Sequence, residues 1–442
     1  MTQPQPSPDE LRQQLAALER SLADLRAAGM GEAVLAPLRD QANVIRNRIV
    51  AGGDADGRDK IIQGDEVHGD KVMGDKIFAI ADRSPEELLR LYLRSLADEC
   101  CRLPLGVIHR EFVRTGDEVP IPLPDVYVDL DVVVAPAAHK QRERTSALRL
   151  AHGEGGDRQP LLPTLARQES SRAVLLGDPG SGKTTFVNYL TYLLATGSPA
   201  LPPDFAGLLP FRLVLREVAS QNIPAGATRG TAQMLWEALG KDLVARLGQV
   251  AGEKLLPYLQ ARMADQGAFV LLDGLDEAPA ARERRAVLVQ SIAALAGSLG
   301  LPGGRSRILV TARPHAYTNK AWRLPGFAVF GLAPFNEGQV DRFVERWYGA
   351  ARTSMKWSEA TAREKAGRLN AALREREYLA ALASRPLLLT LMATLHSSEG
   401  GQLPEDRADL YEETVKLLLG RWQRERELIG PDGELLVEPA IA

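Results

Sequence analysis

The sequence predicts an α/β fold with buried parallel strands, and three features of the chain support this class. An apolar run at 173–176 has the length and composition of a buried strand. Apolar residues then recur at helical spacing between 186 and 194. A second apolar run, at 268–272, ends in acidic residues, and the runs at 209–215 and 307–312 add two further candidate strands.

The turn between the first of these strands and the helix after it carries a phosphate-binding motif. Gly177 to Thr184 follows the pattern Gly-x-x-x-x-Gly-Lys-Thr. The first amides of a helix have no partner within it and can bind phosphate oxygens, and glycines let the backbone approach without a Cβ clash. A chance glycine-rich loop is the alternative, which the strand before it and the helix after it disfavour.

This loop predicts a site for a nucleotide, ATP or ADP, together with Mg²⁺. Lys183 would reach the β- and γ-phosphates, the Thr184 hydroxyl would ligate the metal, and Thr185 would lie at the α- and β-phosphates. The predicted nucleotide contacts of the loop are Gly177, Asp178, Pro179, Gly180, Ser181, Gly182, Lys183, Thr184 and Thr185.

Polar residues at the ends of two later strands complete the predicted site. Asp273 follows the apolar run 268–272, and a carboxylate there, beside the phosphate loop, can hold Mg²⁺. Asp276 and Glu277 lie one turn further on, and either could orient a hydrolytic water. Arg313 ends the strand 307–312, where it is placed to sense a γ-phosphate. A solvated acidic turn and a surface ion pair are the alternatives for these residues.

The chain before the nucleotide core divides into three predicted regions, of which the first two are 1–50 and 51–80. Residues 1–50 form two helices, either an antiparallel hairpin or a short coiled coil, because leucines recur at spacings of four and three. Residues 51–80 contain a Gly-Asp repeat with a period of about five. This repeat predicts either β-rungs that pair between chains or with a partner protein, or a solvated linker.

The third region, 81–168, is predicted as a helix followed by extended chain. Ser84 caps a helix that runs from Leu88 to about Leu103. The prolines of 119–130 exclude a helix there and favour an edge strand or coil. The polar and basic stretch 136–158 is expected to be a surface loop.

Composition limits the classes of function. At 442 residues the chain should hold two to four units, and 45% apolar with 25% charged residues is typical of a globular protein. A net charge of −3 argues against broad nucleic-acid binding. No apolar run is long enough for a membrane helix, and the polar start resembles no secretory signal. Two adjacent cysteines, Cys100 and Cys101, offer no disulfide framework, so we expect a reducing cytoplasm.

With these motifs in order, the sequence resembles the NACHT branch of the signal-transduction STAND ATPases. The Asp-Gly-Leu-Asp-Glu form of 273–277 is particularly similar to NACHT proteins. The stretches that carry the resemblance are 177–185, 209–215, 271–277, 308–314, 332–343, 384–389 and 407–411. The lead-in at 125–130 and the Gly-Asp repeat are similar to those of bacterial NACHT proteins, including ones implicated in anti-phage defence.

The resemblance implies a fold, an activity and a mode of action. The fold would be an AAA+-like P-loop core at 169–335, a helical domain at 336–404 and the start of a winged helix at 405–442. Pro386 would pack against the adenine. The activity would be that of a slow ATPase switch that forms a homo-oligomer on activation. The alternatives are a regulatory or scaffold protein outside defence, a constitutive or motor-type ATPase, and a degenerate scaffold that binds no nucleotide.

Overall fold

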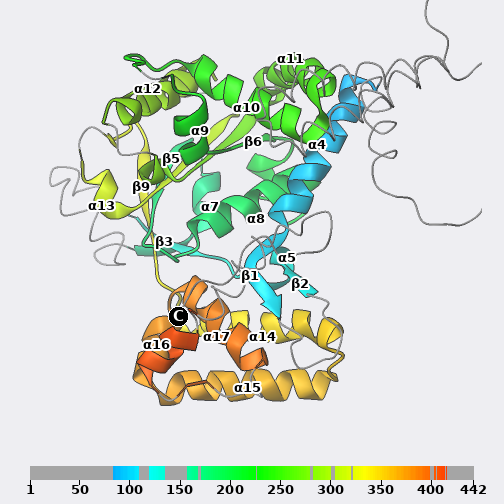
Figure 1. Ribbon diagram of the computed structural model, residues 1–442, viewed down its shortest axis with the longest axis vertical. Coiled ribbons are helices and arrows are strands. Elements are labelled where there is room, and N and C mark those ends of the chain that lie inside the picture. The colour runs from blue at the N-terminus through cyan, green and yellow to red at the C-terminus, as the bar shows by residue number, and fades with distance from the viewer. Residues whose placement is uncertain are drawn as a thin grey trace, which may run out of the picture. The chain divides into compact units, whose positions relative to one another are not determined.

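A seven-stranded sheet organises the part of the chain that the structure, a computed structural model, describes (Figure 1). The described residues are 83–108, 119–134, 157–167, 171–224, 226–278, 282–299, 304–319, 322–398, 403–404, 406–413 and 415. The predicted helices of 1–50, the repeat of 51–80 and most of the predicted winged helix at 405–442 lie outside them, as does most of the stretch 136–158.

The sheet has five parallel strands and an antiparallel extension at one edge. Its strand order is β4-β3-β9-β5-β8-β7-β6, and the neighbours from β9 to β6 all pair in parallel. β3 is antiparallel to both β9 and β4. The strands are β3 (Asp131–Val134), β4 (Asp157–Pro160), β5 (Arg172–Leu176), β6 (Leu209–Val214), β7 (Ala268–Asp273), β8 (Arg307–Ala312) and β9 (Ala328–Leu332). The predicted α/β core with a parallel sheet is confirmed.

Strand order brings the predicted site residues to one edge of the sheet. β8 lies between β5, which leads into the phosphate loop, and β7, which ends at Asp273. The register pairs Leu176 with Ala312 and Leu272 with Val310, so the three strands end at nearly the same level. Their carboxyl ends therefore meet, as is usual for binding sites of parallel sheets.

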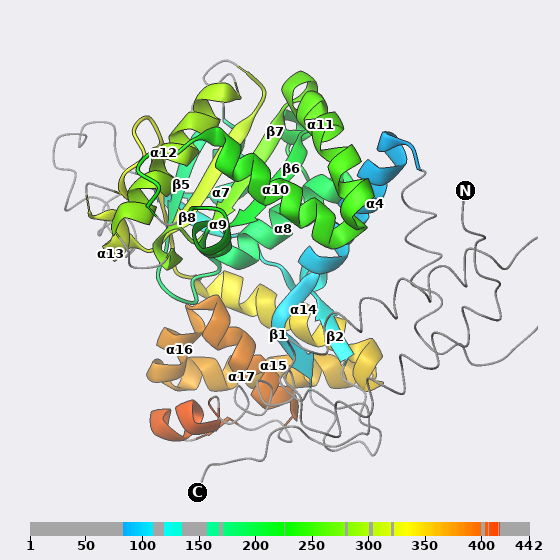
Figure 2. The ribbon, with the colours of Figure 1, turned by 45° about the horizontal axis from the view of Figure 1, so that its top comes forward.

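Helices cover both faces of the sheet because every strand of the core is buried on both sides. Ala173 and Leu175 of β5 belong to a buried cluster with the helix α8, whereas Val174 and Leu176 pack on the opposite side in a second cluster. The helices around the sheet can be followed in Figure 2. The helices that share that second cluster include α9 (Leu215–Gln221), α10 (Ala232–Leu247), α11 (Gln249–Gln266) and α12 (Arg282–Ser298), and α8 itself spans Lys183–Thr196.

The lead-in region differs from its prediction at two points. The helix α4 (Pro85–Cys100) has the predicted Ser84 cap, but it ends before Leu103 because Arg102 already begins the strand β1 (Arg102–Ile108). β1 pairs with β2 (Val119–Pro122), and the one-turn helix α5 (Leu123–Val126) follows directly. The prediction that prolines exclude a helix from this stretch is wrong. Pro124 sits in the first turn, where its missing amide costs no helical hydrogen bond.

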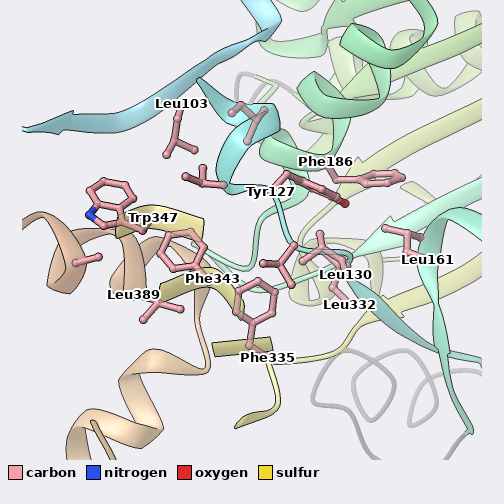
Figure 3. Close-up of a cluster of buried hydrophobic side chains, with 14 of the residues drawn as sticks. Leu103, Tyr127, Leu130, Leu161, Phe186, Leu332, Phe335, Phe343, Trp347 and Leu389 are labelled. Atoms are coloured by element: carbon pink, nitrogen blue, oxygen red, sulfur yellow. The ribbon is translucent and has the colours of Figure 1, made fainter. Parts of the chain in front are cut away.

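A bundle of four helices follows β9. α14 (Glu337–Met355), α15 (Glu359–Glu375), α16 (Glu377–Ala383) and α17 (Pro386–Ser398) share a core in which Trp347 and Tyr348 are fully buried. That core is continuous with one face of the sheet, since Trp347, Phe343 and Phe186 belong to the same cluster (Figure 3). Shorter elements are α7 (Leu161–Ala166), α13 (Pro314–Tyr317) and the 3₁₀ turns Pro203–Phe205 and Leu275–Glu277.

No single helix among those described is long and apolar enough to cross a bilayer. Taken together, α16 and α17 are long and apolar enough to span a membrane by length and composition only, but the pair is bent by 118°. Leu382 of α16 and Leu389 of α17 are buried in the core of the bundle.

Candidate nucleotide-binding site

A cavity of about 320 Å³ lies at the carboxyl edge of the sheet, between the phosphate loop and the start of α17. Its polar end is lined by Lys183, Thr184, Asp273, Glu277 and Arg313 among others. Its apolar end is formed by side chains from four separate parts of the chain. These side chains are Leu103, then Leu123, Val126, Tyr127, Val128 and Leu130, then Phe335 and Phe343, and finally Pro386 and Leu387. One end is therefore charged and polar, and the other is apolar.

The phosphate loop presents unused amides to the polar end. Gly182 is the N-cap of α8 with a φ of 96°, a left-handed conformation that glycine adopts readily. The first bond of the helix runs from the Phe186 N–H to the Gly182 carbonyl. The amides of residues 183–185 therefore precede the hydrogen-bonded ladder and are available to an anion at the positive end of the helix.

The loop also touches the helical bundle directly. The Leu387 N–H at the start of α17 donates to the Gly180 carbonyl at 3.2 Å. A Cβ at Gly180 would lie 3.0 Å from the Leu387 Cβ, and its φ of 74° is left-handed. Glycine is required there for both reasons, and the phosphate loop and α17 are held as neighbours.

Lys183 is a largely buried ammonium group with neutral partners. Its Nζ donates to the carbonyls of Gly177 at 2.6 Å and Asp178 at 3.0 Å. Burial lowers the pKa of Lys183, and the nearby carboxylates of Asp276 and Asp273 oppose that shift. A phosphate in the cavity would give this desolvated cation the counter-charge that two carbonyls cannot supply.

Asp273 is 6% exposed and is held by two threonine hydroxyls. The Thr184 hydroxyl donates to its Oδ2 at 2.8 Å, and the Thr311 hydroxyl donates to its Oδ1. One carboxylate beside one hydroxyl fits Mg²⁺, which takes few protein ligands and completes its shell with phosphate oxygens and water. Among the described residues, no group of three or more His, Cys, Asp or Glu side chains could hold a metal ion.

Thr311 is a residue of the site that the sequence reasoning missed. It is fully buried on β8 between the loop strand and β7, and its hydroxyl also accepts from the Gly274 N–H at 2.8 Å. It therefore fixes both the orientation of Asp273 and the turn that follows. A polar residue next to the end of an otherwise apolar strand was the available signal.

The geometry separates the two carboxylates that the sequence left as alternatives. Asp276 is 8% exposed, and both its oxygens are used by Arg313, one by the backbone N–H and one by Nε, each at 2.9 Å. Glu277 is 43% exposed, and its carboxylate is 4.0 Å from the Arg313 guanidinium. Glu277 can thus accept a hydrogen bond from a water, whereas Asp276 is occupied in orienting Arg313.

The apolar end of the cavity is formed by apolar side chains, which offer contact surface rather than hydrogen-bonding groups. Pro386, which the family resemblance implied, lies with its Cγ 3.7 Å from where a Cβ of Gly182 would be. Tyr127, Leu130, Phe335 and Phe343 were not predicted, and they lie together in the cluster of Figure 3. This end can hold a flat apolar group by contact on its faces.

Most predicted site residues line this one cavity. The lining includes Pro179, Gly180, Gly182, Lys183, Thr184, Thr185, Asp273, Asp276, Glu277, Arg313 and Pro386. Gly177, Asp178 and Ser181 belong to the loop but do not line the cavity. Gly177 and Asp178 act through their carbonyls, which accept from Lys183.

Comparison with known families agrees with this geometry. Residues 171–351 match the family model of the NACHT domain. The chain carries a NACHT domain. NACHT domains are P-loop nucleoside triphosphatases of the signalling type, which supports a nucleotide-binding NTPase function for this chain. No curated protein was found that matches the chain.

Proposed function

We propose that this NACHT protein is an ATP-binding switch that hydrolyses ATP slowly and forms a homo-oligomer when activated. The observation that supports this most directly is the Asp276–Arg313 pair at the polar end. A guanidinium fixed beyond the phosphate loop meets the terminal phosphate of a triphosphate, and a diphosphate does not extend so far. Such a contact exists with one nucleotide only, which is the requirement for a two-state switch.

Each residue of the polar end then has a defined task. Lys183 and the amides of 183–185 bind the phosphates, and Thr184 with Asp273 would hold Mg²⁺, which neutralises charge that develops on the phosphate oxygens. Thr311 keeps Asp273 in the orientation that this requires. Glu277 orients the attacking water, and Asp276 keeps Arg313 directed at the terminal phosphate.

The setting of this switch is proposed on the resemblance alone. Similarity to bacterial NACHT proteins, some implicated in anti-phage defence, motivates a role in bacterial innate immunity in the cytoplasm. Residues 1–80 are the proposed contact with a partner protein or with further copies of the chain. A regulatory protein outside defence and a constitutive ATPase are the competing functions.

Nucleotide titration with a matched pair of lysine variants tests the binding step. Wild-type protein should bind fluorescent ATP and ADP analogues in the presence of Mg²⁺. Lys183→Ala should weaken binding by at least ~100-fold, because a charge–phosphate contact in a desolvated site is lost. Lys241 also donates to a carbonyl but is exposed outside the cavity, so Lys241→Ala should bind like the wild type. Equal affinities in the wild type and Lys183→Ala would refute the site.

Turnover and assembly distinguish a switch from a constitutive ATPase. A switch should release phosphate well below the ~1 to 1,000 per second of typical enzymes. Light scattering on the whole chain should give a larger species with a non-hydrolysable ATP analogue than with ADP. Fast turnover that is indifferent to oligomeric state would instead support the constitutive ATPase.

A further inference from the structure

A polar cluster lies beside the apolar end of the cavity, where three segments meet. It consists of Asp131 at the start of β3, Arg158 on β4 and Gln339 in the first turn of α14. We call it the Gln339 cluster. None of its members lines the cavity or was among the predicted site residues.

Gln339 is the centre of this cluster and is only 2% exposed. Its Oε1 accepts from Arg158 Nη2 at 2.5 Å and from the Asn336 N–H at 3.0 Å. Its Nε2 donates to the Asp129 carbonyl at 2.7 Å and lies 3.3 Å from Asp131 Oδ2. A buried amide with all its groups engaged fixes the segments that it joins, because a broken partner would leave a desolvated polar group.

Arg158 donates a hydrogen bond to the segment that connects the sheet to the helical bundle. Its Nε donates to Asp131 Oδ2 at 2.6 Å, and its Nη2 also donates to the Pro334 carbonyl at 2.8 Å. Pro334 lies between the end of β9 and the start of α14. One guanidinium therefore joins β3, β4 and the link through which the bundle is attached to the core.

The segment that the cluster holds is a wall of the cavity. Tyr127, Val128 and Leu130 line the apolar end, and two carbonyls of the same stretch are bound from α14. Gln339 binds the Asp129 carbonyl, and Arg346 Nη1 donates to the Tyr127 carbonyl at 2.6 Å. Phe335 lies on the link between β9 and α14, and Phe343 lies on α14 itself. Both side chains also line the cavity. The wall and α14 thus move together.

We infer that Gln339 and Arg158 are positioning residues of the nucleotide site, which hold the wall at 127–131 against α14 and so retain bound nucleotide. The inference rests on the proposed binding of nucleotide in this cavity. Neither side chain touches the ligand, and each acts through the wall. Loss of either one weakens the attachment of the wall to α14, although Arg346 still binds the wall through a backbone carbonyl. The nucleotide therefore dissociates faster while the phosphate contacts at the polar end stay intact.

Release of a fluorescent ADP analogue from the whole chain tests the inference. Gln339→Met and Arg158→Met should each release it about tenfold faster than the wild type, equivalent to ~1.4 kcal/mol or about one net hydrogen bond to a charged group. The KM for ATP should rise by a similar factor while kcat changes less. Arg374→Met is the matched control, since it breaks the Arg374–Asp341 ion pair of α14 outside the cavity and should leave release unchanged.

Two milder variants keep the test decisive if a methionine variant fails to fold. Gln339→Glu retains the acceptor for Arg158 but loses both donors to the wall, so it should also release the analogue faster. Arg158→Lys keeps the charge but cannot reach Asp131, Pro334 and Gln339 together, and it should show a smaller acceleration.

The outcomes separate the inference from the proposed function. Unchanged release in all folded variants, with or without a lower melting temperature, would show that the cluster is only structural and overturn the inference. A wild-type protein that binds no nucleotide would instead overturn the proposed function, and the inference with it.

Discussion

The two ends of the cavity would contact a ligand through different kinds of interaction. At the polar end, directional bonds fix nearly every functional atom, as with Asp273 between the hydroxyls of Thr184 and Thr311. At the apolar end, Tyr127, Leu130, Phe335 and Phe343 offer only contact surface, and their positions depend on packing in the shared core. Directional bonds discriminate sharply between ligands, whereas apolar contact adds affinity in small and roughly interchangeable amounts.

This contrast indicates where substitutions should be severe. A single change at the polar end removes one bond that no neighbour can replace. A single change at the apolar end removes a fraction of a wall that several segments share. The variants below test this contrast.

Glu277→Gln should reduce the rate of ATP hydrolysis by at least ~100-fold, because a carboxylate that orients and deprotonates water contributes about that factor. Binding of ATP should be unchanged, since Glu277 is partly exposed and its ion pair with Arg313 is as long as 4.0 Å. Single-turnover phosphate release and a binding titration on the same variant measure both. Hydrolysis at the wild-type rate would remove Glu277 from catalysis.

Asp276→Asn should lower hydrolysis by roughly tenfold and reduce the preference for ATP over ADP, because the ion pair that orients Arg313 is weakened. Arg313→Gln should have the same two effects. The double variant should be no worse than either single one, as expected for residues that act as a unit. If the rate losses of the two single variants instead multiply in the double variant, Asp276 acts independently of Arg313.

Burial of His396 in α17, within the bundle beside the apolar end, should make the stability of the folded protein depend on pH. Burial, with smaller contributions from Lys365 and Arg368, lowers the pKa of His396 to about 4, and its Nδ1 meets the Tyr348 hydroxyl. The folded-state pKa is below the unfolded value of ~6.5, so this stability is complete above pH 6.5 and is lost as the pH falls toward 4.

Between pH 7 and pH 5.5 this loss should amount to about 1 kcal/mol. Urea unfolding of the wild type and of His396→Asn at both pH values measures it. Asparagine cannot gain a proton but can still pair with Tyr348, so the variant should lose less stability than the wild type on acidification. Equal losses would assign the pH dependence to other groups.

Leu387→Ala should weaken ATP and ADP equally, by only about two- to fivefold. Leu387 is 40% exposed and lines the cavity beside Gly180, so its truncation removes a limited apolar area. Val250 is 63% exposed and lies outside the cavity, and Val250→Ala is the control. A loss as large as that of Lys183→Ala would erase the contrast between the two ends.

The same contrast explains what the sequence could predict. The phosphate loop is contiguous, and Asp273 and Arg313 end apolar strands, so local pattern placed all three. The apolar end consists of common core residues, such as Leu130 and Phe343, that look like any other buried position. Only the tertiary arrangement brings them together, and Pro386 was found through family resemblance rather than through pattern. Thr311 had a signal, a hydroxyl in a buried strand, but its partner Asp273 is distant in sequence.

Strand order also has a consequence for how the chain is made. β5, which leads into the phosphate loop, is central in the sheet, but its neighbours β8 and β9 begin only at Arg307 and Ala328 and are translated much later. At ~5–20 residues per second, this delay is on the order of ten seconds. During that time the apolar segment Ala173–Leu176 has no sheet partner on either side. The element that defines the site is thus the one most exposed to wrong pairing in the nascent chain, and chaperone occupancy should peak before β8 emerges.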